Sequence, residues 1–161
     1  MKTSLAEPPR APPNVEFRSS ILQRRLGPPT AVFADARGQL IAWAVPNRGL
    51  FVSVGSGHGS AAFVKPFLAA ANTAIAAGAR EIWDDWARIT SYDSEARVQF
   101  TQWAKARPTI APNVRLLVGS RLIAMGVAIA NLGLGNTFHV TADRAKFEGA
   151  ILARLEGGKG T

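Results

Sequence analysis

The sequence predicts a single α/β domain, built on a mixed, mostly parallel sheet of about five strands with about four helices. The chain of 161 residues has the length of one ordinary domain, and 47% of its residues are hydrophobic, enough for a buried core. From residue 50 onward, strand-like segments alternate with segments of helical periodicity. This alternation is typical of parallel strands joined by right-handed helical crossovers. The domain is expected to span residues 30–157.

Residues 1–29 are predicted to form a proline-rich, basic N-terminal arm. They contain six of the ten prolines and five basic against two acidic residues, a net charge of +3. Repeated prolines favour an extended chain over a packed core. The more apolar part, 15–26, could dock on the domain as an edge strand or a short helix. At the other end, residues 158–161 are expected to be flexible.

The first half of the domain reads as an antiparallel meander. Three short apolar runs are separated by turn signals at 35–38 and 46–49, where Asp, Asn, Pro and Gly gather. The predicted strands are 31–34, 40–45 and 50–54. They would form an antiparallel edge beside the parallel strands.

The second half supplies the alternating strands and helices. Alanine-rich and periodic segments predict helices, and short β-branched or aromatic runs predict strands. The segments are, in order, a helix at 61–79, a strand at 81–89, a helix opened by 91–94, a strand at 114–118, a buried helix at 121–134, a strand at 137–141 and a final helix capped by Asp143.

Several kinds of chemistry are excluded or disfavoured by the residues present. The chain has no cysteine, which excludes disulfides and thiolate sites, and its two histidines lie far apart. Gly119-Ser120 lacks the flanking residues of a nucleophile elbow. Asp84 and Asp85 are adjacent on a predicted strand, so they should point to opposite faces and make a poor acid–base pair. We therefore expect no catalytic residue, no metal and no cofactor.

A glycine-rich segment at 55–60 follows one predicted strand and opens a helix. Backbone amides in that position can bind an anion, which makes Gly57, His58 and Gly59 a candidate anion or ligand loop. Its spacing matches neither the dinucleotide-binding fingerprint nor the P-loop. The alternative is that the segment is only a flexible connector.

The net charge of +8 comes from residues spread along the chain, without a basic run interleaved with aromatics. We therefore do not expect nucleic acid as a partner.

The longest apolar run, 122–135, is too short to span a bilayer and is expected to be a core helix, with a surface that dips into lipid as the alternative. Because the first residues carry no apolar signal segment, we expect a cytoplasmic protein.

The order of elements resembles that of the STAS family, which includes bacterial anti-sigma factor antagonists. In that family the strand before the second helix ends in a motif like Thr-Phe-Met-Asp-Ser-Ser-Gly, and Asp93-Ser94 falls on its Asp-Ser pair. Gly133-Leu134 matches a Gly-Leu that precedes the last strand in many members. Glu95-Ala96 replaces the Ser-Gly that usually follows the pair, so the chain looks closer to a divergent STAS-like branch, which is also compared with Sec14-type lipid-binding domains.

The resemblance implies a non-catalytic bacterial regulatory module that docks a partner protein through the junction at 89–96. Its partner would be a serine kinase-type regulator or a second copy of the chain. The candidate phosphorylation and partner site comprises Ser91, Tyr92, Asp93 and Ser94, and the candidate interaction surface comprises Arg121, Leu122, Gly133 and Leu134. Asp93 and Glu95 already carry negative charge and would oppose a phosphate on Ser94. The alternative is that Ser91, Asp93 and Ser94 only cap a helix.

Two further hypotheses remain open from the residues themselves. The small residues of helices 61–79 and 122–134 could leave room against the sheet for a small apolar or lipid ligand, or a lipid surface could be the partner. An enzyme that uses the glycine-rich loop and His58 is the remaining alternative.

Overall fold

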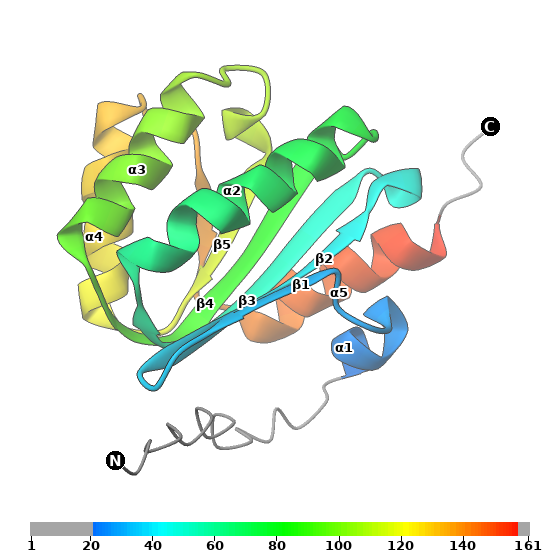
Figure 1. Ribbon diagram of the computed structural model, residues 1–161. Helices are drawn as coiled ribbons and strands as arrows, with labels where there is room; N and C mark the ends of the chain where they lie inside the picture. The colour runs from blue at the N-terminus through cyan, green and yellow to red at the C-terminus, as the bar shows by residue number, and fades with distance from the viewer. Residues whose placement is uncertain (1–20, 158–161) are drawn as a thin grey trace, which may run out of the picture.

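The computed structural model describes residues 21–157, which form one six-stranded sheet with helices on both faces (Figure 1). The strands are β1 (Ala31–Ala34), β2 (Gly38–Val45), β3 (Leu50–Gly59), β4 (Glu81–Tyr92), β5 (Val114–Val118) and β6 (His139–Thr141). The helices are α1 (Ile21–Leu26), α2 (Ala61–Ala76), α3 (Ser94–Lys105), α4 (Arg121–Gly133) and α5 (Arg144–Glu156).

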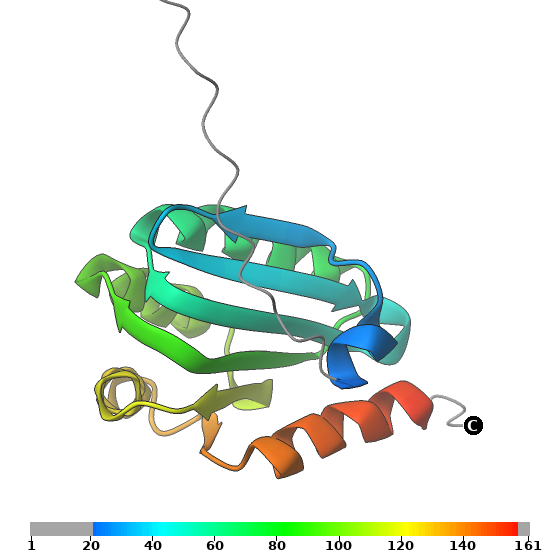
Figure 2. The ribbon, with the colours of Figure 1, turned by 90° about the horizontal axis from the view of Figure 1, so that it is seen from below.

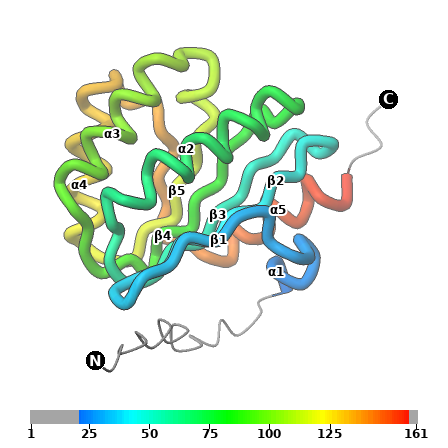
Figure 3. Tube along the Cα trace, viewed as in Figure 1, coloured from blue at the N-terminus to red at the C-terminus, as the bar shows by residue number. Residues whose placement is uncertain are grey.

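The sheet has the mixed topology that the sequence predicts. Its strands follow chain order, with β1, β2 and β3 antiparallel and β3 to β6 parallel. The tube in Figure 3 shows that α2, α3 and α4 make the connections between the parallel strands. The described chain has six strands and five α-helices, close to the expected five and four. The predicted α/β class is confirmed.

Each face of the sheet carries its own core because side chains alternate along the strands. Phe51 and Ile82 belong to the larger core under α2, α3 and α4. Their neighbours Val52 and Trp83 belong to the core under α5. The ring of Trp83 meets Phe147 of α5 edge-on, with centroids 5.3 Å apart.

Within the part of the predicted arm that the structure describes, residues 21–29, Ile21–Leu26 form the helix α1. Leu22 of α1 is buried against the α5 side of the sheet, and Figure 2 shows α1 beside the C-terminal half of α5. This arrangement matches the alternative in which the apolar end of the arm docks as a short helix. The remainder of the arm, 1–20, and the predicted flexible C-terminus, 158–161, lie outside the described residues.

Two strands run further than expected. The glycine-rich segment, predicted as an anion or ligand loop or a flexible connector, is the end of β3, and Ser91 and Tyr92, predicted to open a helix, are the end of β4. Glycine allows this extension, because a Cβ at Gly38 of β2 would overlap the backbone of His58. The pairing of β3 with β4 is irregular after Val54, as expected where bulges re-aim side chains. None of the helices within 21–157 has the length and apolar character needed to cross a bilayer.

Candidate ligand cavity

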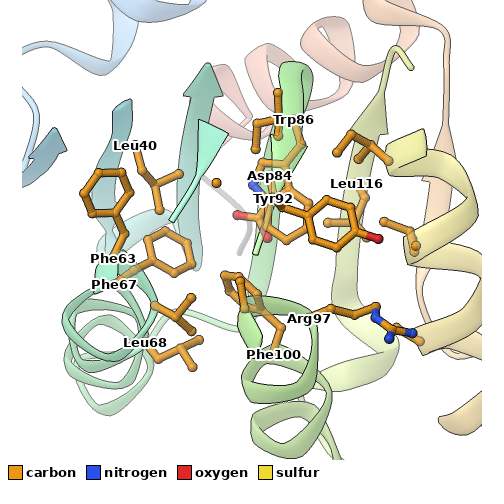
Figure 4. Close-up of a pocket in the computed structure, with 18 of the residues that line it drawn as sticks. Leu40, Phe63, Phe67, Leu68, Asp84, Trp86, Tyr92, Arg97, Phe100 and Leu116 are labelled. Atoms are coloured by element: carbon orange, nitrogen blue, oxygen red, sulfur yellow. The ribbon is translucent and has the colours of Figure 1, made fainter. Parts of the chain in front are cut away.

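A cavity of about 120 Å³ lies between the sheet and the layer formed by α2, α3 and α4. The residues that line it, many of which Figure 4 draws, come from β2, β3, β4 and β5 on one side and from the three helices on the other. Small side chains on the helices explain the space, since Ala71, Ala96 and Ala130 all face it. The room between helix and sheet that the small-residue helices suggested is therefore present.

The walls of the cavity are mainly aromatic. The ring of Phe100 lies 5.2 Å from Trp86 and 5.8 Å from Phe67, in tilted and edge-on geometries that favour attraction between rings. Phe63 and Tyr92 add further rings. An interior of this composition accepts apolar groups.

One buried carboxyl group, that of Asp84, lines this apolar space. Asp84 is 4% exposed, and its Oδ1 accepts a 2.6 Å hydrogen bond from the hydroxyl of Ser53, which lies opposite it on β3. Burial raises the pKa of Asp84 to about 7, and the Ser53 hydrogen bond opposes this rise. Asp84 can therefore change its charge near neutral pH inside an apolar cavity.

Trp86 contributes a second polar group to the same region. Its indole Nε1 is buried and, within the described residues, has no hydrogen-bond partner. Buried donors of this kind are rare and each calls for an explanation, such as a bound group that accepts the hydrogen bond. Trp86 also lines the cavity, two residues after Asp84 on the same face of β4.

The two candidate sites predicted from separate motifs meet at one edge of the cavity. His58, which lines the cavity, has its Nδ1 2.7 Å from Ser91 Oγ and its Nε2 2.9 Å from Asp93 Oδ1. The other carboxylate oxygen of Asp93 accepts a hydrogen bond from the Ala61 amide at the start of α2. The Ala61 amide and then His58 hold the pKa of Asp93 below its usual value.

This arrangement contradicts the alternative in which Ser91 and Asp93 only cap the helix α3. Asp93 occupies the N-cap position of α3, but its side chain makes no hydrogen bond to that helix. The side chain of Asp93 accepts a hydrogen bond from the first amide of α2 instead, because the neighbouring ends of β3 and β4 bring the start of α2 beside Asp93. Ser91 lies within β4 and bonds His58 rather than a helix amide.

The three residues share the composition of a Ser-His-Asp set, but their surroundings differ from those of a hydrolase. Ser91 is not among the residues that line the cavity. The carboxylate of Asp93 already accepts a hydrogen bond from the Ala61 amide. The residues of 21–157 also include no group of three or more His, Asp or Glu side chains placed to hold a metal ion.

The other predicted surface residues lie at several places. Tyr92 lines the cavity, and its hydroxyl touches α4 at Gly126, where a Cβ would overlap it. Ser94, at the first position of α3, is exposed, as are Arg121, Leu122 and Gly133 of α4, while Leu134 is partly buried.

The expectation that 122–135 forms a core helix is correct for only one face of α4. Ile123 and Val127 are buried, whereas the opposite face carries exposed apolar side chains. These are Leu122, Met125, Ile129 and Leu132. Because α4 lies beside β6 near one edge of the sheet, nothing in the described chain covers that face.

Sequence reasoning missed the residues that give the cavity its chemistry, namely Ser53, Asp84 and Trp86. The placement of Asp84 and Asp85 on opposite faces was predicted and is confirmed by their partners on the two sides of the sheet. The available signal was the position of Asp84 inside an apolar strand, two residues from a tryptophan on the same face.

Comparisons with known proteins yield a match of fold only. No family model matches the chain, and no curated protein matches it. Among solved structures it is similar to an uncharacterized protein of the DUF3478 family with a SpoIIAA-like fold from Shewanella loihica PV-4. The TM-score is 0.44 at 10% identity, over 72% of this chain and 86% of that chain.

Proposed function

We propose that this protein binds a small, mainly apolar ligand in the cavity between its sheet and α2, α3 and α4, without converting it chemically. The observation that carries the proposal is the cavity itself, with aromatic walls and a single carboxyl group. A protein interior is ordinarily packed with few voids larger than a water molecule. A space of this size over the middle of the sheet therefore favours a binding role.

The size of the cavity limits the ligand. An apolar cavity of roughly 150 Å³ holds one benzene ring, and the cavity here is about 120 Å³. The ligand is therefore a compound of about one ring, or one end of a longer molecule. Filling such a space recovers roughly 24 cal/mol per Å³, on the order of 3 kcal/mol in total, which corresponds to a dissociation constant on the order of several millimolar.

Calorimetric titration with toluene tests this proposal. The parent protein is expected to bind one toluene, and Ala96→Leu, which fills the cavity from α3, should abolish the heat of binding. The matched control is Ala150→Leu on α5, which packs against the other core and should bind as the parent does. Absence of binding to the parent, or equal binding by Ala96→Leu, would contradict the proposal.

We also propose a second function, in which phosphorylation of Ser94 controls the docking of a partner protein. Ser94 is exposed at the first position of α3, and no side chain caps that helix because Asp93 bonds Ala61. A phosphate at this position would meet the positive end of the helix dipole. Asp93 and Glu95 would oppose it only in part, since the Asp93 carboxylate is already hydrogen-bonded to His58 and to the Ala61 amide.

Phosphopeptide mass spectrometry of the protein from its native cells tests the modification directly. The partner set captured by Ser94→Asp should then differ from that captured by Ser94→Ala. Thr109→Asp, which adds the same charge at an exposed position beyond α3, should behave as the parent does. Ser94 that stays unmodified, or identical capture by both Ser94 variants, would contradict this function.

A further inference from the structure

We propose that the ligand of the cavity carries an amine, whose protonated nitrogen pairs with the carboxylate of Asp84 while its apolar body packs against the aromatic walls. This inference rests on the proposed binding function and specifies the chemical class of the ligand. It is carried by the position of Asp84 at the cavity and by the absence, within 21–157, of an ion-pair partner for this carboxyl group.

Asp84 is built into the site in a way that favours a cationic ligand. A carboxylate buried without a cation is strongly destabilising, so natural proteins pair such groups or keep them protonated. The hydroxyl of Ser53 occupies Oδ1 and holds the carboxyl group in place. An ammonium group would form a charge-assisted hydrogen bond with Asp84, which is stronger than a bond to a neutral donor.

Asp85, the next residue in the chain, shows how this protein pairs a buried carboxylate with a cation. Asp85 lies in the same strand and is also buried, but Arg144 holds it with two hydrogen bonds of 2.7 and 3.2 Å. Among residues 21–157, Asp84 is hydrogen-bonded only by the neutral hydroxyl of Ser53. Burial keeps the pKa of Asp84 near 7, so a cation in the cavity would lower that pKa and ionise the group at neutral pH.

The aromatic walls would offset part of the cost of dehydrating an ammonium group. The faces of aromatic rings attract cations, and the attraction grows when both groups are removed from water. The rings of Phe67, Phe100 and Trp86, which contact one another, line the same cavity as Asp84 (Figure 4). A carboxylate in a cavity with such a cluster of rings is suited to a compound that combines an amine with an apolar body.

The other charged or titratable groups that line the cavity do not bond the carboxyl group of Asp84, so it can pair with a ligand. Arg97 of α3 lines the cavity, but Figure 4 shows its guanidinium directed toward α4 and away from Asp84. His58 of β3 has both ring nitrogens occupied by Ser91 and Asp93. Tyr92 of β4 directs its hydroxyl toward Gly126 of α4. None of these groups is a hydrogen-bond or ion-pair partner of Asp84 in the described structure.

Three probes of nearly equal shape separate this inference from the general binding function. Toluene, benzyl alcohol and benzylamine differ only in the group attached to the ring carbon, and benzylamine is protonated throughout the pH range used. Affinities are measured by calorimetric titration at pH 8 and pH 5.5, with the parent protein and with Asp84→Asn. Asn has the shape of Asp without the charge, which makes it a conservative change.

At pH 8 the parent protein is expected to bind benzylamine at least about ten-fold more tightly than toluene, the ratio that a charge-assisted hydrogen bond provides. The preference should shrink at pH 5.5, where Asp84 is protonated, and should be lost in Asp84→Asn while toluene binding persists. Toluene binding without a preference for benzylamine, or a preference that Asp84→Asn retains, would overturn this inference alone. A parent protein that binds none of the three probes would overturn the binding function as well.

Discussion

Asp84 and Asp85 are consecutive residues of β4, yet their carboxylates lie on opposite faces of the sheet and meet opposite kinds of partner. Asp85 faces α5 and is held by the guanidinium of Arg144, whereas Asp84 faces the cavity and is bonded by the hydroxyl of Ser53. Adjacent residues of one strand therefore provide an ion pair on one face of the sheet and, on the other face, a carboxyl group that can bind a ligand.

The carboxyl group of Asp84 is expected to make the stability of the protein depend on pH. Its pKa is raised from 3.8 to about 7 by burial, so between these values the folded protein retains a proton that the unfolded chain has lost. Its contribution to stability is complete below about pH 4 and is lost as the pH rises to about 7, a change on the order of 4 kcal/mol.

Asp84→Asn should remove this dependence. Urea denaturation is expected to give the variant and the parent similar stability at pH 4, and to give the variant the higher stability at pH 8. Asp143→Asn, at the N-cap of α5 where Asn caps equally well, serves as the control and should follow the parent. If Asp84→Asn were no more stable than the parent at pH 8, Asp84 would not be a buried, unpaired carboxyl group.

Loss of Arg144 should destabilise the protein more than loss of an exposed arginine. Arg144→Met leaves Asp85 buried without its cation, and we expect a cost of about 2 kcal/mol, reduced from the fully buried case because Arg144 is 38% exposed. Arg25→Met, which breaks an exposed pair with Glu156, should cost less than about 1 kcal/mol. The double variant with Asp85→Asn and Arg144→Met should recover part of the lost stability, as measured by urea denaturation. Equal losses of stability in Arg144→Met and Arg25→Met would contradict this expectation.

Asp93 is expected to protect the first turn of α2 rather than that of α3. In Asp93→Ala the Ala61 amide loses its acceptor, so its hydrogen exchange should accelerate relative to the parent protein. Ser94→Ala changes the neighbouring exposed side chain and should leave the Ala61 amide as it was. Unchanged exchange of Ala61 in Asp93→Ala would show that this hydrogen bond does not form in solution.

A methyl group at Gly126 is expected to disturb the cavity through Tyr92. The added Cβ of Gly126→Ala would overlap the Tyr92 hydroxyl, and we expect a loss of about 1–3 kcal/mol in the free energy of unfolding. Tyr92→Phe in the same chain should recover much of this loss by removing the overlapping oxygen. Gly133→Ala, where a Cβ meets nothing within 4 Å, is the matched control and should be neutral or slightly stabilising. Tolerance of Gly126→Ala equal to that of Gly133→Ala would contradict the contact.

The larger features of the fold could be predicted because they depend on local patterns. Alternation of apolar runs and helical segments after residue 50 identified the parallel strands, and turn residues at 46–49 marked the antiparallel meander. The opposite placement of Asp84 and Asp85 followed from the two-residue period of a strand alone.

The candidate site could be predicted only in part because its contacts join distant segments. His58 and Asp93 were each selected from separate motifs, but their hydrogen bond depends on the parallel register of β3 and β4. The pair of Ser53 and Asp84 depends on the same register, which no local pattern encodes. The exposure of one apolar face of α4 entered the sequence analysis only as the alternative to a core helix, because it follows from the position of α4 near an edge of the sheet.

The indole N–H signals of the four tryptophans offer the most direct test of the cavity as a binding site. Trp86 and Trp103 line the cavity, whereas Trp43 and Trp83 bond Gly27 and Glu81 outside it. In proton–nitrogen correlation spectra, with Trp86→Phe to assign its signal, toluene should shift the signals of Trp86 and Trp103 in a saturable manner and leave the other two in place. A spectrum in which Trp86 does not respond, or in which all four signals drift together without saturation, would contradict the proposed function.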